Sequence, residues 1–457
     1  MTSQLVSIHT PGLKWFLNHL ENEFESQASL QLYINALKRR SVRNPTPCAF
    51  GTAHLLLRLV SHHKDATVQG LVPFALNLET ELSAARPREM AIRNMVRRLL
   101  GVIREESQNL GLEDLFEAAM RDTEEDEDDD DVFTPNKPPT PVARTLPRIP
   151  LLSSHTSFHV QSAQVTSLFS SLASAGIAGT RPTTPKVSPL PSGIHTPDNN
   201  GQISQAQDQR KLRSTIIEDI QDLIEELENC DKNINDLAPS LIHRHEVIMT
   251  YGLPSTLHKF LLRAAVKNPD FTLIVVEGNP NIMHHTHGTV MNKIPIGDES
   301  DDATQSAATK KSLQERGVQV VVISDADIFN FISRVNKVFI QANYVLCNGA
   351  VVAAAGTSNL AYVAQTMKKP VIAIAGTHQL CPAVALNKED LIEMGPSVTV
   401  RFNEGELVDH ADSPNPLTDY IDPGTVAYFA TNNGLLPAAS LQGNILQLYH
   451  MPEADLV

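Results

Sequence analysis

The sequence contains few cysteines and no long hydrophobic run. Four cysteines, Cys48, Cys230, Cys347 and Cys381, are spread over 457 residues without a CxxC pair, so neither a disulfide framework nor a zinc site is indicated. No apolar stretch approaches the roughly 20 residues that a helix needs to cross a bilayer. The amino terminus lacks a basic region followed by an apolar core, so we expect no secretory signal and a soluble, cytosolic protein.

Positive charge is also scarce. The chain has 37 Lys and Arg residues against 52 Asp and Glu residues, and its formal net charge is -15. This balance argues against general binding of nucleic acid or of a membrane surface by the whole chain. Much of the excess is local, because residues 124–131 are all acidic.

The first part of the chain, residues 1–120, is predicted to be an all-α domain. Apolar residues recur at helical spacing, as in Ile92, Val96 and Leu99, and no strand-like alternation is present. Pro87 suits the first turn of the helix that carries these residues.

Residues 121–208 are predicted to be a disordered insertion. The segment begins in the acidic run and continues with many Pro, Ser and Thr residues. Such a composition cannot bury enough apolar surface to offset the entropy lost on ordering. Apolar residues return in helical phase over 209–240, which we predict to be a connecting helix that Pro239 ends.

Residues 241–457 are predicted to form an α/β domain with a Rossmann-like parallel sheet. The β-branched runs Thr272–Val276, Val318–Ile323, Lys337–Gln341 and Pro370–Ala375 show no polar alternation. Runs of this kind are typical of parallel strands that are covered on both faces. A last helix is expected over Leu441–Tyr449.

Ligands of such sheets bind beyond the carboxyl ends of the strands, where this chain has mainly small and amide residues. Gly356-Thr357 resembles a strand-to-helix turn whose amides can hold phosphate. The pattern is neither GxGxxG nor a P-loop and contains no Lys, so a tight turn with close backbone packing is favoured.

Two further clusters have competing interpretations. Asp325 and Asp327 are candidates for acid–base work, although no His or Cys is placed beside them and Asp327 is favoured as the cap of a helix near Ile328. His284, His285 and His287 have metal-ligand chemistry, but they lie in a polar stretch with no nearby Cys. We therefore predict no metal and no cofactor.

Four arginines, Arg93, Arg97, Arg98 and Arg104, lie on the helix that follows Pro87. Clusters of arginine bind acidic or phosphorylated partners. A solvated helix face, or a dock for the acidic run of the same chain, explains them equally well.

Several motifs in order resemble one known family. Arg93–Leu100 and Ile103–Glu106 resemble the helical domain of beta-type regulatory subunits of eukaryotic translation initiation factor 2B. Glu246–Gly252 resembles the start of the α/β domain of these subunits, and Ser333–Val338 and Leu448–His450 match as well. The wider family includes the alpha and delta subunits of that factor and isomerases of methylthioribose-1-phosphate and ribose-1,5-bisphosphate.

The resemblance implies a vestigial pocket without catalytic residues. Gly252 stands where the isomerases have a catalytic Cys, Asn279 where they have a ligand-holding Arg, and Asn343 where they have an Asp. Ala353-Ala354 replaces the Asn-Lys before Gly356-Thr357, and Asp325 alone keeps the catalytic-type acid. Without the thiol no partner shares the proton work, and without Arg and Lys no cation holds phosphate.

The function implied by the resemblance is that of a non-catalytic regulatory subunit in the guanine-nucleotide exchange factor for initiation factor 2. The expected partners are the alpha, gamma, delta and epsilon subunits in a decamer, and the phosphorylated or unphosphorylated alpha subunit of initiation factor 2. Arg93, Arg97, Arg98 and Arg104 are the candidate contacts with initiation factor 2. The alternatives are a sugar-phosphate aldose–ketose isomerase with an altered site and a nucleotide-sensing module.

Overall fold

The computed structural model describes residues 11–22, 26–65, 67–128, 199–278, 308–385, 387–395 and 414–450. The chain divides into two compact units, Met1–Asp128 with Ser204–Val457 and Asp129–Ile203. The elements below belong to the first unit, apart from the opening residues of one long helix. Within the described ranges, no helix is long and apolar enough to cross a membrane.

The amino-terminal part is helical, as predicted. Its helices are α1 (Pro11–Asn22), α2 (Ser26–Lys38), α3 (Pro45–His62), α4 (Val68–Ala85), α5 (Met90–Asn109) and α6 (Glu113–Asp128). Pro45 opens α3, where the missing amide hydrogen has no intrahelical partner to lose. Pro87 instead lies in a turn, and α5 begins three residues later, with Glu89 at its N-cap position. Helix α6 runs past the predicted boundary at 120, since the glutamates of the acidic run are good helix formers.

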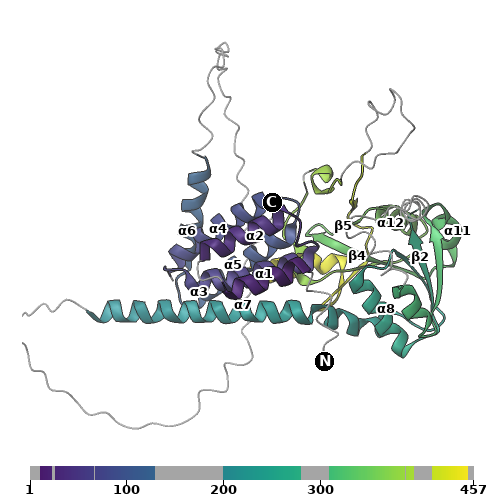
Figure 1. The fold of residues 1–457 in the computed structure, drawn as a ribbon, viewed down its shortest axis with the longest axis horizontal. Coiled ribbons are helices and arrows are strands. Elements are labelled where there is room, and N and C mark those ends of the chain that lie inside the picture. Colours follow the sequence, from purple (N-terminus) through teal and green to yellow (C-terminus); the bar gives the residue numbers. More distant parts are fainter. Residues whose placement is uncertain are drawn as a thin grey trace, which may run out of the picture. The chain divides into compact units, whose positions relative to one another are not determined.

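The long helix α7 (Asn199–Leu241) runs from the amino-terminal helices to the α/β part (Figure 1). Its residues from Leu212 to Leu227 pack with the helical core, and those from Cys230 to Ala238 pack beneath the sheet. The helix starts ten residues before the predicted position. It also includes Pro239, which was expected to end it, because a proline this near the end removes only one backbone hydrogen bond.

The carboxyl-terminal part has the predicted Rossmann-like sheet. Its parallel strands follow the order β6-β4-β1-β2-β3, with β9 parallel to β6 and β10 antiparallel at the edge. The strands are β1 (Val247–Tyr251), β2 (Thr272–Glu277), β3 (Gln319–Ser324), β4 (Lys337–Leu346), β6 (Val371–Ile374), β9 (Tyr428–Thr431) and β10 (Gly434–Pro437).

Strand β4 is five residues longer than predicted. Its register shifts between Ala342 and Tyr344. From Ala342 it pairs with β5 (Val351–Ala354), and from Val345 it also pairs with β7 (Leu380–Cys381). Strand β5 also pairs with β8 (Thr418–Ile421). The bulge therefore sends β4 from the parallel sheet into a second set of strands, which faces the helical part.

Both faces of the parallel sheet are covered, which explains its continuous apolar strands. Helix α8 (Ser255–Lys267) packs on one face through Leu257, Phe260 and Leu261. The other face is covered by α11 (Ile328–Phe331), α12 (Thr357–Thr366) and α14 (Leu441–Tyr449), the last with the predicted bounds. Short 3-10 turns link these elements, among them η2 (Asp325–Asp327), η4 (Thr377–Gln379) and η5 (Lys388–Leu391).

Candidate functional site

Tyr251, the last residue of β1, lies at the centre of the strand ends. Its hydroxyl group donates a hydrogen bond to Asp325 Oδ2 at 3.3 Å. Gly252 follows with a left-handed φ of 61°, and a Cβ added there would meet no atom within 4 Å. The backbone conformation, rather than lack of space, therefore favours glycine at the position where the resemblance expects the catalytic thiol.

Gly356 packs against the same tyrosine. It is the N-cap of α12, with a φ of 94°, and any Cβ placed on it would overlap the Tyr251 hydroxyl group. Gly356 and Thr357 thus form the tight turn with close packing that the sequence favoured, and the packing partner is the Tyr251 ring.

The start of α12 already holds an anion from the same chain. Asp419 Oδ2, on β8, accepts hydrogen bonds from the Gly356 amide at 2.7 Å, the Ser358 amide at 3.2 Å and the Ser358 hydroxyl at 2.7 Å. Free amides at a helix start are what a phosphate group uses. Here these donors point at a carboxylate of the protein.

A backbone amide at the start of α8 is also bound by a side chain of the same chain. Gln341 Oε1, on β4, accepts a hydrogen bond from the Leu257 amide at 3.3 Å. Two helix starts that face the strand ends are therefore occupied by side chains of the sheet.

The described residues of this site include no activated nucleophile. Burial, with the nearby Asp325 and Asp419, raises the pKa of Tyr251 to about 12, so the phenol stays a neutral donor. Burial also raises the pKa of Asp325. All four cysteines are free and buried, and burial raises the pKa of each thiol, which keeps these thiols protonated.

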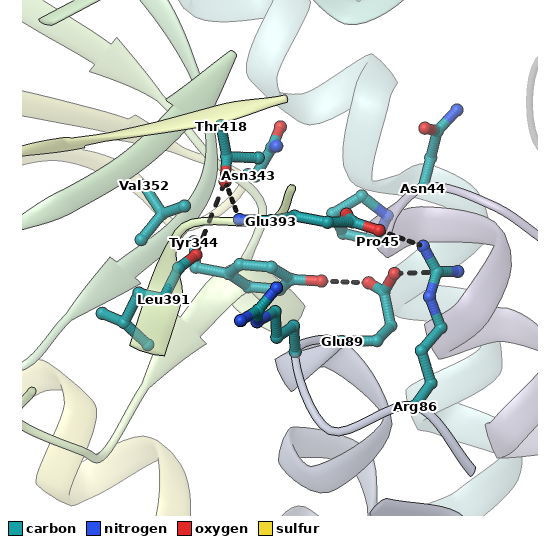
Figure 2. A pocket seen from close by; sticks show the side chains of 11 residues that line it. Asn44, Pro45, Arg86, Glu89, Asn343, Tyr344, Val352, Leu391, Glu393 and Thr418 are labelled. Carbon is teal, nitrogen blue, oxygen red and sulfur yellow. Dashed lines mark hydrogen bonds and ion pairs between the residues drawn. The ribbon is translucent and has the colours of Figure 1, made fainter. Parts of the chain in front are cut away.

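Asn343 lies elsewhere, in a small polar pocket at the junction with the helical part (Figure 2). It occupies the β4 bulge, while Arg86, Glu89 and Glu393 line the same pocket. The cavity of about 70 Å³ has room for a few water molecules.

The structure therefore does not gather all the residues of the predicted pocket. Asp325 and Gly356 contact Tyr251, while Gly252 and Thr357 are the chain neighbours of Tyr251 and Gly356. Asn343 lies in the junction pocket instead. Asn279 lies outside the described residues.

Paired charges line the junction pocket. The Tyr344 hydroxyl donates to Glu89 Oε1, and Arg86 Nη1 lies 3.2 Å from Glu89 Oε2 (Figure 2). Glu393 Oε1 forms an ion pair with Arg40 Nη2 at 2.9 Å. Burial raises the pKa of Glu89, while Arg86 and the Tyr344 hydroxyl oppose the rise. The cluster links β4 to the α4–α5 turn, and sequence reasoning missed it.

The four arginines proposed for partner binding all have partners within the chain. Arg93 and Arg97 share Glu79 Oε1, at 3.1 and 3.2 Å. Arg98 is 10% exposed and lies 2.8 Å from Glu226. Arg104 donates to the His450 carbonyl at 2.9 Å and lies over the Phe116 ring. Half of the Arg93 side chain is exposed, which makes it more accessible than Arg97 or Arg98.

Two other sequence interpretations have separate outcomes. Asp327 occupies the N-cap position of α11, which begins at Ile328 as expected, but its side chain makes no capping hydrogen bond and instead accepts from the Asn330 side chain. The side-chain cap is that of Ser324, which accepts from the Ala326 amide in the preceding turn. His284, His285 and His287 lie outside the described residues. In the ranges that the structure describes, no group of three His, Cys, Asp or Glu residues could hold a metal ion.

Comparisons with known proteins agree with this architecture. A profile of the initiation factor 2 subunit family matches residues 159–438. The chain is 31% identical over 427 residues to translation initiation factor eIF2B subunit beta of Schizosaccharomyces pombe, covering 93% of this chain and 95% of that one. It is 25% identical over 269 residues to ribose 1,5-bisphosphate isomerase of Pyrococcus furiosus, covering 58% of this chain and 75% of the relative.

A solved structure shares the fold. It is a chain of the tetrameric eIF2B-beta2-delta2 complex from C. thermophilum, with a TM-score of 0.57 and 22% identity over 95% of this chain and 99% of that one. Together with the strand ends described above, the family profile and the full-length relative lead to one conclusion: the chain belongs to the initiation factor 2 subunit family, which is related to the ribose 1,5-bisphosphate isomerases.

Proposed function

We propose that the chain is a non-catalytic regulatory subunit of the guanine-nucleotide exchange factor for translation initiation factor 2. One observation supports the proposal: the Tyr251 ring and the Asp419 carboxylate occupy the space and the donors at the start of α12 that a phosphorylated substrate would need. The resemblance adds that Gly252 stands where the isomerases have a thiol. Among the described residues of the strand ends, Asp325 is hydrogen-bonded to the neutral Tyr251 phenol and not to a thiol, so it lacks the second proton-transferring group that the isomerisation needs.

The proposal assigns separate roles to the two parts of the chain. The α/β part assembles with delta, alpha, gamma and epsilon subunits in the cytosol. The similarity to the beta subunit of Schizosaccharomyces pombe supports this assignment, and a chain of the same fold from C. thermophilum forms a complex with delta subunits. The helical part receives the alpha subunit of initiation factor 2, and the phosphorylated form of that subunit inhibits exchange.

Native mass spectrometry of the tagged chain, purified from its own cells, tests the assembly. The expected spectrum shows the chain in a complex with the other four kinds of subunit. A stable monomer that captures none of them would refute the scaffold role.

The second candidate is a sugar-phosphate isomerase with an altered site, which the similarity to ribose 1,5-bisphosphate isomerase supports. The purified chain is incubated with ribose-1,5-bisphosphate and, separately, with methylthioribose-1-phosphate. We expect no product above a buffer blank. Turnover that disappears in the Asp325→Asn variant would favour the enzyme over the regulatory subunit.

A further inference from the structure

We propose that Asp419 and Tyr251 act as an internal ligand, in which the protein's own carboxylate and phenol close the strand-end site. The inference rests on the proposed non-catalytic function and deepens it. It states that the site is inert because it is filled, and not only because a catalytic thiol is missing.

The geometry of Asp419 is that of a bound anion. One carboxylate oxygen takes three donors, two of them backbone amides, at 2.7 to 3.2 Å. Successive side chains of a strand point to opposite faces, and β8 uses this alternation: Thr418 lines the junction pocket while Asp419 reaches α12. Asp419 is thus held by a strand that pairs along its length with β5.

The Tyr251 side chain blocks the strand-end site independently of Asp419. Its phenol packs on Gly356, the residue whose amide binds Asp419, and its hydroxyl donates to Asp325, the acid retained from the catalytic pattern. A ligand that reached the α12 amides would have to displace a carboxylate and move a half-buried ring. The same two side chains therefore cover both the donors for an anion and the retained acid.

The contact also accounts for the sequence around it. A lysine before Gly356 is unnecessary when the anion is a fixed carboxylate already held by three neutral donors. The left-handed Gly356 is needed because any side chain would collide with Tyr251. A cysteine introduced at Gly252 would consequently restore a nucleophile beside a site that substrate cannot enter.

The test removes the internal anion and offers an external one. Asp419→Ala is made in the full chain, and thermal unfolding is followed with inorganic phosphate or with chloride at equal ionic strength. Loss of a helix cap should lower the unfolding midpoint by about 2 to 4 °C. Phosphate, but not chloride, should recover part of that loss, because it can accept from the vacated amides.

Asp422→Ala is the matched control. Asp422 lies just beyond β8, is 64% exposed and pairs with Lys388 instead of with α12. Wild type and Asp422→Ala should both show no phosphate-specific stabilisation. Phosphate stabilisation of the wild type equal to that of Asp419→Ala would overturn the proposal, since the site would then be open already.

A second variant keeps the test decisive where alanine prevents folding. Serine removes the charge and leaves room while remaining a polar neighbour for the helix start, so Asp419→Ser is titrated with phosphate and followed by phosphorus NMR. Line broadening greater than that of the wild type supports the contact, and identical line widths overturn it. Neither result depends on partner subunits, whereas isomerase turnover by the wild type would refute the proposed function.

Discussion

Glu226 on α7 and Arg98 on α5 form an ion pair of 2.8 Å at the point where the helical part meets the α/β part. The second carboxylate oxygen of Glu226 accepts from Thr377 at 2.6 Å and from Asn432 at 3.0 Å. One oxygen of the Glu226 side chain therefore binds α5, and the other binds η4 and the turn that follows β9. It lies on α7 where that helix passes from the helical core to the core beneath the sheet.

Glu226→Gln should lower the free energy of unfolding by about 2 to 4 kcal/mol, because it leaves the guanidinium of Arg98 buried without a counter-charge. Glu117→Gln is the control, since Glu117 pairs with Arg121 on an exposed face of α6 and should contribute at most about 1 kcal/mol. Urea denaturation of the two variants measures the difference. Equal losses would show that the Glu226 pair is no more important than a surface pair.

The same pair predicts a dependence on pH. Burial would raise the pKa of Glu226, but Arg98 and the hydrogen bonds from Thr377 and Asn432 bring it below its ordinary value of 4.5. A depressed pKa in the folded state stabilises the protein above the ordinary pKa, and this stabilisation is lost as the pH falls through the folded-state pKa. The stability difference between wild type and Glu226→Gln should therefore narrow below about pH 4.5. A difference that stays constant from neutral to acidic pH would contradict this explanation.

Gly101→Ala should lower the free energy of unfolding by disturbing the contact between α5 and α14. A Cβ at this position of α5 would lie 2.7 Å from the carbonyl oxygen of Tyr449, and a backbone atom cannot rotate away. The expected loss is about 1 to 3 kcal/mol in thermal or urea unfolding. Gly443→Ala on α14 meets nothing within 4 Å and should instead gain up to about 1 kcal/mol from helix propensity. Matching effects of the two substitutions would rule out the steric cause.

Periodicity predicted the elements well because it reports burial. Thr272–Val276 and Leu441–Tyr449 are apolar where the structure buries them, and both elements appear within one residue of the prediction. Boundaries were less predictable, since they depend on contacts made elsewhere. Met90 rather than Pro87 opens α5, and the preceding Glu89 accepts a hydrogen bond from Tyr344, about 250 residues away in the chain.

For the site, the sequence predicted which catalytic residues are missing, but not which side chains occupy their place. Gly252 and Asn343 were predicted to be replacements because they stand in local motifs, and this stays a prediction, whereas Asp419 is 63 residues from the amide that it binds. No local pattern marks such a contact. Tyr251 did have a signal, because it stands beside Gly252 at the end of a predicted strand, and a large ring at a strand end is a candidate to fill a pocket.

Tyr344→Phe should reduce stability through Glu89. Removal of the hydroxyl group takes one donor from a carboxylate that is 7% exposed, at an expected cost of about 1 to 3 kcal/mol. It should also raise the pKa of Glu89 further, because the tyrosine hydrogen bond opposes the effect of burial. Tyr362→Phe serves as the control, since Tyr362 is 67% exposed and its substitution should change stability by less than about 0.5 kcal/mol. An unchanged urea midpoint for Tyr344→Phe would mean that the hydroxyl group contributes nothing to this junction.

The arginines of α5 can be separated into surface and junction residues by charge reversal. Arg93→Glu changes a half-exposed side chain that shares Glu79 with Arg97, so folding should be nearly unaffected. Under the proposed function it should weaken inhibition by the phosphorylated alpha subunit of initiation factor 2, and the effect should shrink at high salt. Arg98→Glu places a second carboxylate against Glu226 in a buried site and should lower the unfolding midpoint of the chain itself.

Both variants are assembled with the other subunits and assayed for exchange with phosphorylated and unphosphorylated substrate at low and high salt. Thermal unfolding of the same samples separates a lost contact from a lost fold. A salt-dependent loss of inhibition in Arg93→Glu, at an unchanged unfolding midpoint, would assign the exposed part of α5 to the substrate contact. If Arg93→Glu alters neither activity in an intact complex, Arg93 is only a partner of Glu79, and the regulatory contact lies on another surface of the helical part.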